Sequence, residues 1–144
     1  MHAFPHLSLV LGGARSGKSA FAERLAISAN RPRAYIATSQ AFDAEMEAKI
    51  TKHRRDRGPD WQTIEAPLDI AGATAEVAAN SVVLIDCLTL WLSNQMHAEA
   101  DVDTEITKLL TTLSATPNPV ICVSNEVGMG LVPDTPLGRQ FRDF

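Results

Sequence analysis

The chain has 144 residues, of which 45% are hydrophobic and 21% charged, and its formal net charge is −4. This length supports one domain with a core of its own. The mild acidity argues against a general nucleic-acid binder or a membrane-surface binder, because such proteins usually carry a basic surplus. The two cysteines follow no disulfide or zinc spacing, and the longest apolar segment is interrupted by Asp86. We therefore expect a cytoplasmic protein without a membrane span.

Five short β-rich runs alternate with helical patterns along the chain. The expected strands are 7–11, 33–38, 62–66, 82–86 and 119–124. The expected helices are 19–29, 41–57, 68–79, 87–100 and 101–114, the last with Asp101 or Asp103 as its N-cap. This alternation predicts one α/β domain over residues 1–144, with three α/β/α layers and a mostly parallel sheet whose apolar strands are covered on both faces. Right-handed crossovers then place the C-terminal strand ends on one edge, where ligands usually bind.

The first expected strand runs into the sequence GGARSGKS, which matches the pattern G-x-x-x-x-G-K-[ST] at Gly12, Gly17, Lys18 and Ser19. Glycines let the backbone turn its N–H groups toward phosphate oxygens. The lysine can reach the β- and γ-phosphates, and the serine hydroxyl can bind Mg²⁺. The alternative is a chance match in a glycine-bearing turn. The strand before the motif and the helix after it favour a P-loop nucleotide site.

An acidic residue, Asp86, closes the apolar run VVLID. An acid at the end of a buried strand fits the Walker-B role, in which it orients Mg²⁺ or a water bound to the ion. The alternative is an aspartate that only caps the next helix. Beside a P-loop the metal role is favoured, so Ser19 and Asp86 are the expected Mg²⁺ ligands.

A basic stretch, KITKHRRDR, ends the second expected helix. Helical spacing puts Phe42, Met46, Ile50, His53 and Arg57 on one face, which we expect to turn inward and to present its last two members to a polyphosphate. The alternative is a helix end rich in cations because they suit the negative end of the dipole. The pattern alone does not make the histidine a nucleophile. The chain shows no N-K-x-D motif and no protein-kinase signature, which leaves small-molecule phosphotransferases and bare ATPase modules.

Five segments, in order along nearly the whole chain, resemble the bifunctional adenosylcobinamide kinase/adenosylcobinamide-phosphate guanylyltransferase family of cobalamin biosynthesis. They are LVLGGARSGKSAFAE, YIATSQAFDAEMEAKITKHRRDRGPDW, TIEAP, LIDCLTLWLSN and VSNEVGMGLVPDTPLGRQFRD. The resemblance implies an enzyme with two reactions. First, ATP or GTP phosphorylates adenosylcobinamide. GTP then guanylylates a histidine of the enzyme, and the GMP passes to adenosylcobinamide phosphate, giving adenosylcobinamide-GDP.

The resemblance also implies which residues act. His53 matches the guanylylated histidine by its place in the motif. The implied nucleotide contacts are Gly12, Gly13, Ala14, Arg15, Ser16, Gly17, Lys18, Ser19, Ala37, Thr38, Ser39, Arg54, Arg55, Asp56, Arg57, Glu65 and Asp86. By its residues alone, Glu65 is either a reader of the ribose or guanine edge or an exposed strand-end acid. The NEVGMG segment is either a substrate lid or a plain loop.

Members of this family continue beyond the residue that matches Phe144 and assemble as trimers. The resemblance therefore implies a C-terminally shortened member, without the end of a helix and a further strand, and a homo-oligomer. Two alternatives stay open at this point. One is a P-loop kinase of another small alcohol, with His53 as a substrate contact, and the other is a truncated, non-catalytic nucleotide-binding module.

Overall fold

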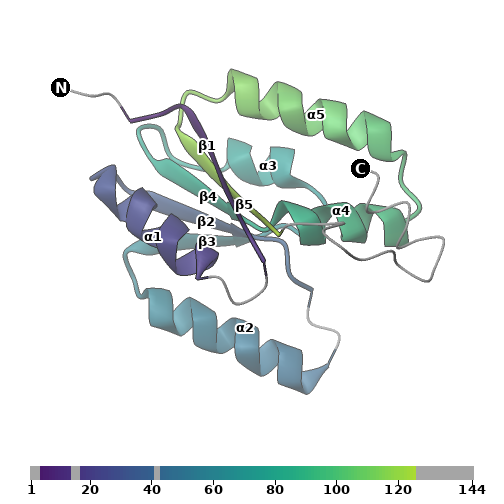
Figure 1. Cartoon of the computed structure of the whole chain (residues 1–144), viewed down its shortest axis with the longest axis horizontal. Coiled ribbons are helices and arrows are strands. Elements are labelled where there is room, and N and C mark those ends of the chain that lie inside the picture. Colours follow the sequence, from purple (N-terminus) through teal and green to yellow (C-terminus); the bar gives the residue numbers. More distant parts are fainter. Residues whose placement is uncertain (1–3, 14–16, 41–42, 126–144) are drawn as a thin grey trace.

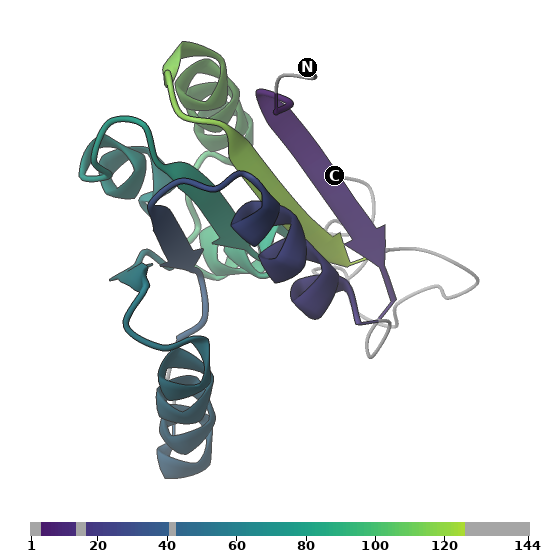
Figure 2. The same ribbon diagram turned by 90° about the vertical axis from the view of Figure 1, so that its left-hand side faces the viewer.

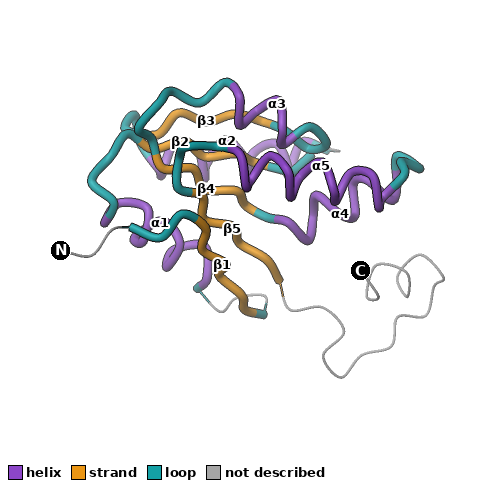
Figure 3. The backbone as a smooth tube through the Cα atoms, turned by 90° about the horizontal axis from the view of Figure 1, so that it is seen from above, coloured by secondary structure: helices purple, strands orange, loops and turns teal. Residues whose placement is uncertain are grey.

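A computed structural model describes residues 4–13, 17–40 and 43–125. Its five strands form one parallel sheet in the order β1-β5-β4-β2-β3 (Figure 1). The strands are β1 (Leu7–Gly12), β2 (Arg33–Ala37), β3 (Trp61–Glu65), β4 (Val82–Asp86) and β5 (Val120–Asn125). The helices are α1 (Lys18–Ser28), α2 (Ala44–Arg57), α3 (Ile70–Ala75), α4 (Leu88–His97) and α5 (Val102–Ala115). Figure 3 shows the strands (orange) running side by side.

Two apolar clusters, one on each face of the sheet, hold the three layers together. On one face of the sheet, α1 packs Ala22 and Ala26 against β4 and β5. On the other face, α3, α4 and α5 cover the same strands, with Trp91 of α4 and Leu109 of α5 in the cluster. Figure 1 shows α1 on one side of the sheet and α3 to α5 on the other. The predicted α/β/α fold with a parallel sheet is therefore confirmed.

The ends of the elements follow local signals in the sequence. Each strand lies within about one residue of its predicted range, because apolar β-branched runs between turn residues mark strands well. The Asp101 side chain accepts a hydrogen bond from Thr104 N, so Asp101 is the N-cap of α5. Helix α3 is shorter than predicted, since it begins only after Asp69, whose carboxylate accepts from Gly72 N, and ends at Ala75.

Strand β1 differs from the prediction that the apolar strands are covered on both faces. It lies at the edge of the described sheet and pairs with β5 alone. Its outward leucines are half exposed: Leu7 50%, Leu9 58% and Leu11 57%. By contrast, every residue of β4 before Asp86 is buried.

Helix α2 stands away from the sheet, and Figure 2 shows it projecting from one end of the molecule. Its N-terminus is capped by the Asp43 side chain, which accepts from Met46 N at 2.7 Å. The expected inward apolar stripe is wrong for most of its length, because no residue of α2 is buried and Met46 is 39% exposed. Only Ile50 and Arg57 are half-buried. Phe42 lies outside the described residues. None of the helices described is both long enough and apolar enough to cross a bilayer.

Candidate active site

The strand ends bring residues far apart in the sequence onto one edge, which we call the sheet rim and define as the C-terminal ends of the five strands. Strand register pairs Gly12 with Asn125, and pairs Ala37 with both Asp86 and Glu65. The rim is where parallel α/β sheets bind ligands, because loops and helix N-termini converge there. Residues 126–130, which make up the NEVGMG segment after Asn125, lie outside the described residues.

The glycine turn after β1 has the strand–turn–helix context that a P-loop needs. Gly12 ends β1, and Gly17 caps α1 with φ of 79°, a left-handed conformation that favours glycine. The Lys18 ammonium donates a hydrogen bond to the Gly13 carbonyl oxygen at 3.3 Å. The predicted contacts Ala14, Arg15 and Ser16 lie outside the described residues.

The expected metal ligands meet beside this turn. The Ser19 hydroxyl donates a hydrogen bond to Asp86 Oδ2 at 3.1 Å, although the residues are 67 positions apart. A hydroxyl and a carboxylate are hard oxygen ligands, and Mg²⁺ is commonly held by one or two such groups together with phosphate oxygens and water. The pair therefore fits Mg²⁺. No cluster of three or more His, Cys, Asp or Glu side chains suited to a metal occurs in the described part of the chain.

One pocket of about 450 Å³ joins the sheet rim to α2. Its walls come from α1, β2, α2, β4 and the start of α4. The lining residues are Ser19, Ala20, Glu23, Tyr35, Ala37, Ser39, Ile50, His53, Arg57, Asp86, Cys87 and Leu90. The structure thus places His53 in the same pocket as the Ser19–Asp86 pair, although the histidine itself is exposed.

Other predicted contacts lie elsewhere. Arg54, Arg55 and Asp56 are exposed on α2 and do not line this pocket. Gly17 and Lys18 line a neighbouring pocket of about 570 Å³ between β1 and α1. The exposed Glu65 lines a third pocket of about 370 Å³ between β3 and α3. The predicted nucleotide contacts are therefore spread over several surfaces, and those at the Ser19–Asp86 pair and on the inner side of α2 share one cavity.

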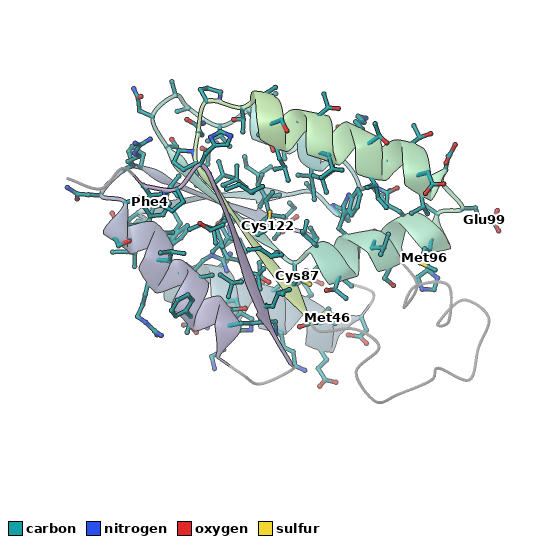
Figure 4. The ribbon with its side chains drawn as sticks, turned by 45° about the horizontal axis from the view of Figure 1, so that its top comes forward. Phe4, Met46, Cys87, Met96, Glu99 and Cys122 are labelled. Carbon is teal, nitrogen blue, oxygen red and sulfur yellow. The ribbon has the colours of Figure 1, made fainter. Side chains whose placement is uncertain are left out.

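Thr38 is fully buried just behind the pocket wall. Its hydroxyl donates to the Cys87 carbonyl oxygen at 2.9 Å and accepts from Cys87 N at 2.8 Å. Its carbonyl oxygen accepts from the Asn94 side chain at 2.8 Å. Thr38 therefore joins the ends of β2 and β4 and holds the N-terminus of α4 against the rim. Figure 4 labels Cys87 at this position, and Cys122 within the sheet.

Tyr35 and Glu23 are among the pocket residues that were not predicted as site residues. The Tyr35 hydroxyl donates to Asp86 Oδ2 at 2.5 Å, the oxygen that also accepts from Ser19. Glu23 lies one helical turn after Ser19, so i,i+4 spacing on α1 could have identified it. Tyr35 gave a weaker signal, a tyrosine two residues before the end of an apolar strand.

Burial and nearby charges shift the pKa values of Glu23 and Tyr35, which both line the pocket. Burial raises the pKa of Glu23; the Arg57 charge lowers it in part, Asp86 raises it and His53 lowers it. Burial also raises the pKa of Tyr35 far above its usual range, with further contributions from the charge of Asp86 and the hydrogen bond to it. The phenol therefore stays protonated at neutral pH and can act as a donor to Asp86.

Solved structures similar to this chain show the fold. The flagellar accessory protein FlaH from Methanocaldococcus jannaschii aligns with a TM-score of 0.50 and 18% identity, covering 96% of this chain and 70% of that one. A DnaB-like replicative helicase aligns with a TM-score of 0.53 and 12% identity, covering 93% of this chain and 42% of that one. At such low identity these matches bear on the architecture alone.

Sequence comparison reaches further. The chain is 46% identical over 138 residues to the bifunctional adenosylcobalamin biosynthesis protein CobP of Pseudomonas aeruginosa, covering 94% of this chain and 80% of that protein. It is 39% identical over 152 residues to the protein CobU of Escherichia coli K12, which has the same bifunctional name, with 94% and 83% covered. Residues 8–144 match the family described as cobinamide kinase / cobinamide phosphate guanyltransferase. These matches confirm the resemblance predicted from the motifs: the chain belongs to the cobinamide kinase / cobinamide phosphate guanyltransferase family.

Proposed function

We propose that this chain phosphorylates adenosylcobinamide and then transfers GMP from GTP to adenosylcobinamide phosphate through a guanylyl group on His53. The description of the family names both activities, a kinase and a guanyltransferase. The observation that carries the assignment of residues is the shared pocket, which is lined both by His53 of α2 and by the Ser19–Asp86 pair of the rim.

The phosphate chain of the nucleotide binds along the glycine turn. Backbone N–H groups at residues 12–19 and the N-terminus of α1 attract its negative charge. The Lys18 ammonium donates a hydrogen bond to the Gly13 carbonyl oxygen. Its flexible side chain can exchange this acceptor for a phosphate oxygen. Ser19 and Asp86 would hold Mg²⁺, which neutralises charge on the phosphates of a bound nucleotide.

In the guanylylation step, a ring nitrogen of neutral His53 attacks the α-phosphorus of GTP. A P–N bond forms while the bond from the α-phosphorus to the pyrophosphate oxygen breaks, and pyrophosphate leaves. A phosphate oxygen of adenosylcobinamide phosphate then attacks the same phosphorus, and the P–N bond breaks to restore the imidazole. Covalent catalysis divides one displacement into two and allows GTP and the corrinoid to use the site in turn.

Arg57 is the α2 cation placed to support this transfer. It lines the pocket and is half-buried. Its Nε atom is buried and finds no hydrogen-bond acceptor within the described residues. A buried donor without an acceptor is costly, so an anionic group bound in this pocket would gain a charge-assisted hydrogen bond.

The kinase step uses the same phosphate-binding turn. The hydroxyl oxygen of the aminopropanol arm attacks the γ-phosphorus, the bond to the nucleoside diphosphate breaks, and the hydroxyl proton is released. Because the protein contributes mainly position and charge to phosphoryl transfer, Lys18 and the Ser19–Asp86 pair are its expected participants. ATP and GTP are both expected donors.

Incubation with GTP labelled at the α-phosphate, in the presence of Mg²⁺, tests the proposal. We expect a label on the protein that is lost in acid and stable in alkali, as a phosphoramidate is. The label should disappear in His53→Asn. It should persist in Lys52→Ala, the matched control, because Lys52 is the exposed residue next to His53 on α2. A label that persists in His53→Asn rejects this histidine. A wild-type protein that binds GTP without labelling rejects the covalent route.

Three further predictions belong to this proposal. Thr38 and Glu65 remain predicted nucleotide contacts. A loss of GTP affinity in Glu65→Gln would support the contact from Glu65.

A homotrimer remains a prediction, and light scattering during size-exclusion chromatography measures its mass directly. A cytoplasmic location follows from the need for GTP and ATP as substrates and is tested by cell fractionation.

A further inference from the structure

The position of His53 depends on how α2 is attached to the rest of the molecule. No residue of this helix is buried, and its side chains that reach the pocket are Ile50, His53 and Arg57. All three lie between residues 50 and 57, while the N-terminal part of the helix projects away from the sheet (Figure 2). Contacts at the C-terminal turn must therefore set the direction of the helix.

A stack of two aromatic rings between two arginines makes these contacts. The Arg57 guanidinium carbon lies 3.6 Å from the centroid of the Tyr35 ring. Tyr35 meets Trp61 edge to face, with centroids 6.0 Å apart and planes at 80°. Arg33 covers the other ring at 5.2 Å from the Trp61 centroid. Both rings are only 8% exposed, so water screens these attractions little.

The stack joins the end of α2 to two neighbouring strands. Trp61 begins β3 only four residues after Arg57, and Tyr35 lies on the neighbouring strand β2. Between them Gly58 ends α2 with φ of 85°, and its N–H donates to the Arg55 carbonyl oxygen at 3.1 Å. The end of α2 is therefore tied to the sheet through side chains on both sides of a tight turn.

Tyr35 belongs to this stack and to the metal pair at once. Its ring contacts Arg57 of α2, and its hydroxyl donates to the Asp86 oxygen that also accepts from Ser19. One buried side chain thus links the cation of the histidine-bearing helix to the acid of the rim.

We propose that Tyr35 is a positioning residue that sets the direction of α2, and thereby places His53, relative to Asp86. The proposal rests on the proposed function for its catalytic readout, since that readout is the guanylylation of His53. The ring holds α2 through its contact with Arg57, and the hydroxyl orients Asp86 through its hydrogen bond. Mutation can separate these two roles.

Tyr35→Phe keeps the ring over which Arg57 stacks and removes the hydroxyl, whereas Tyr35→Leu removes both. The phenylalanine variant should slow the kinase reaction and His53 labelling by the same factor, about tenfold, because both reactions depend on Asp86. The leucine variant should slow labelling at saturating GTP by a further factor of about 10 to 100, since misplacing a nucleophile by about 1 Å costs that much. The ratio of labelling to kinase rate is the measurement that matters.

A second variant covers the case in which Tyr35→Leu does not fold. Arg57→Lys keeps the positive charge on a side chain of α2 but loses the planar group that stacks on the ring. It should lower the ratio of labelling to kinase rate as Tyr35→Leu does. Because Arg57→Lys also removes the buried Nε donor proposed to bind the anion, the hydrogen exchange of α2 without nucleotide separates the two roles of Arg57. Lys52→Arg, an equally conservative change at an exposed position of the same helix, is the control and should leave the ratio unchanged.

Amide hydrogen exchange of residues 44–57 tests the position of α2 without any turnover. Exchange in the last turn should rise in Tyr35→Leu and Arg57→Lys and stay at the wild-type rate in Tyr35→Phe. This result would support the role of Tyr35 even if the wild-type protein takes no label, so failure of the proposed function remains distinguishable. Unchanged exchange in both variants, or an unchanged ratio of labelling to kinase rate, overturns the proposal.

Discussion

The sheet rim and α2 contribute to the same pocket but are built in opposite ways. Behind the rim lie β4 and β5, with Val82 to Ile85 and Val120, Ile121 and Val123 all fully buried. Helix α2 has no buried residue, yet it carries the proposed nucleophile, His53. The phosphate-binding side is thus fixed by the core of the fold, and the histidine side is fixed by a few contacts at one helix end.

This contrast suggests a division of tasks. A group on the rim acts on every phosphate that binds there, so its loss should affect both reactions. A group on α2 should affect only the reaction in which the histidine takes part. Conversely, changes in the core should alter stability, while changes along the outer part of α2 should leave stability nearly as it was. The predictions below test each half of the contrast.

Lys18→Ala is expected to have the largest effect on the two reactions together. It should slow the kinase reaction and His53 labelling by about 10²–10³-fold each, because removal of one group that stabilises transition-state charge typically costs this much.

His53→Asn should abolish labelling and spare the kinase reaction. Both rates are measured on the same preparation with γ- and α-labelled GTP.

Arg24→Ala is the control for Lys18→Ala, because both cations line the neighbouring pocket along α1. It should change neither rate by more than about twofold, as expected for an exposed surface residue. Survival of one reaction in Lys18→Ala would mean that the two reactions use separate nucleotide sites, and the division into rim and α2 would then be wrong.

The next largest effect concerns stability. Ile121→Ala in β5 should lower the free energy of unfolding by about 2–5 kcal/mol, because Ile121 is fully buried and its truncation leaves a cavity. Met46→Ala on α2 should change it by less than about 0.5 kcal/mol, since Met46 is 39% exposed. Urea unfolding followed by circular dichroism measures both. A large loss in Met46→Ala would show that the outer part of α2 is packed in solution.

The sequence predicted the rim better than α2 for a physical reason. Strand runs, the glycine turn and the strand-end acid Asp86 are local patterns, and local patterns set strands, turns and helix starts. The meeting of Ser19 with Asp86 then follows from the rule that parallel strands end on one edge. Family membership was predictable because several motifs occur in the right order.

The direction of α2 was not predictable from its periodicity. The spacing of Met46, Ile50 and His53 is equally consistent with a helix that packs along its whole length and with one held at its end. The choice depends on Arg57 stacking upon Tyr35, and on Tyr35 meeting Asp86 51 positions later. Contacts of this kind appear only when the strands are assembled.

Thr38→Val tests the link between β2 and β4. The substitution keeps the shape of the side chain but leaves Cys87 N–H and C=O without the hydroxyl that pairs with both. We expect the free energy of unfolding to fall by about 1–3 kcal/mol, the cost of unpaired buried polar groups. Thr107→Val, whose exposed hydroxyl donates only to Asp103 of the same helix, is the control. If GTP affinity falls much more than stability, the Thr38 hydroxyl itself contacts the nucleotide, as the family resemblance implies.

Glu23→Gln should have the smallest effect, and its sign depends on pH. Because burial raises the pKa of Glu23, the folded state binds more protons than the unfolded state between the two pKa values. Stability therefore falls as pH rises through this window, and the ionised carboxylate is a cost at neutral pH. Glu23→Gln should raise the melting temperature by about 1–2 °C at pH 7, with the difference vanishing below about pH 4, where Glu23 is protonated in both states. Exposed Glu99→Gln should show no such trend. A melting temperature that falls at pH 7 would mean that attraction to Arg57 and His53 outweighs the burial of Glu23, and that this acid helps to hold α2 against the rim.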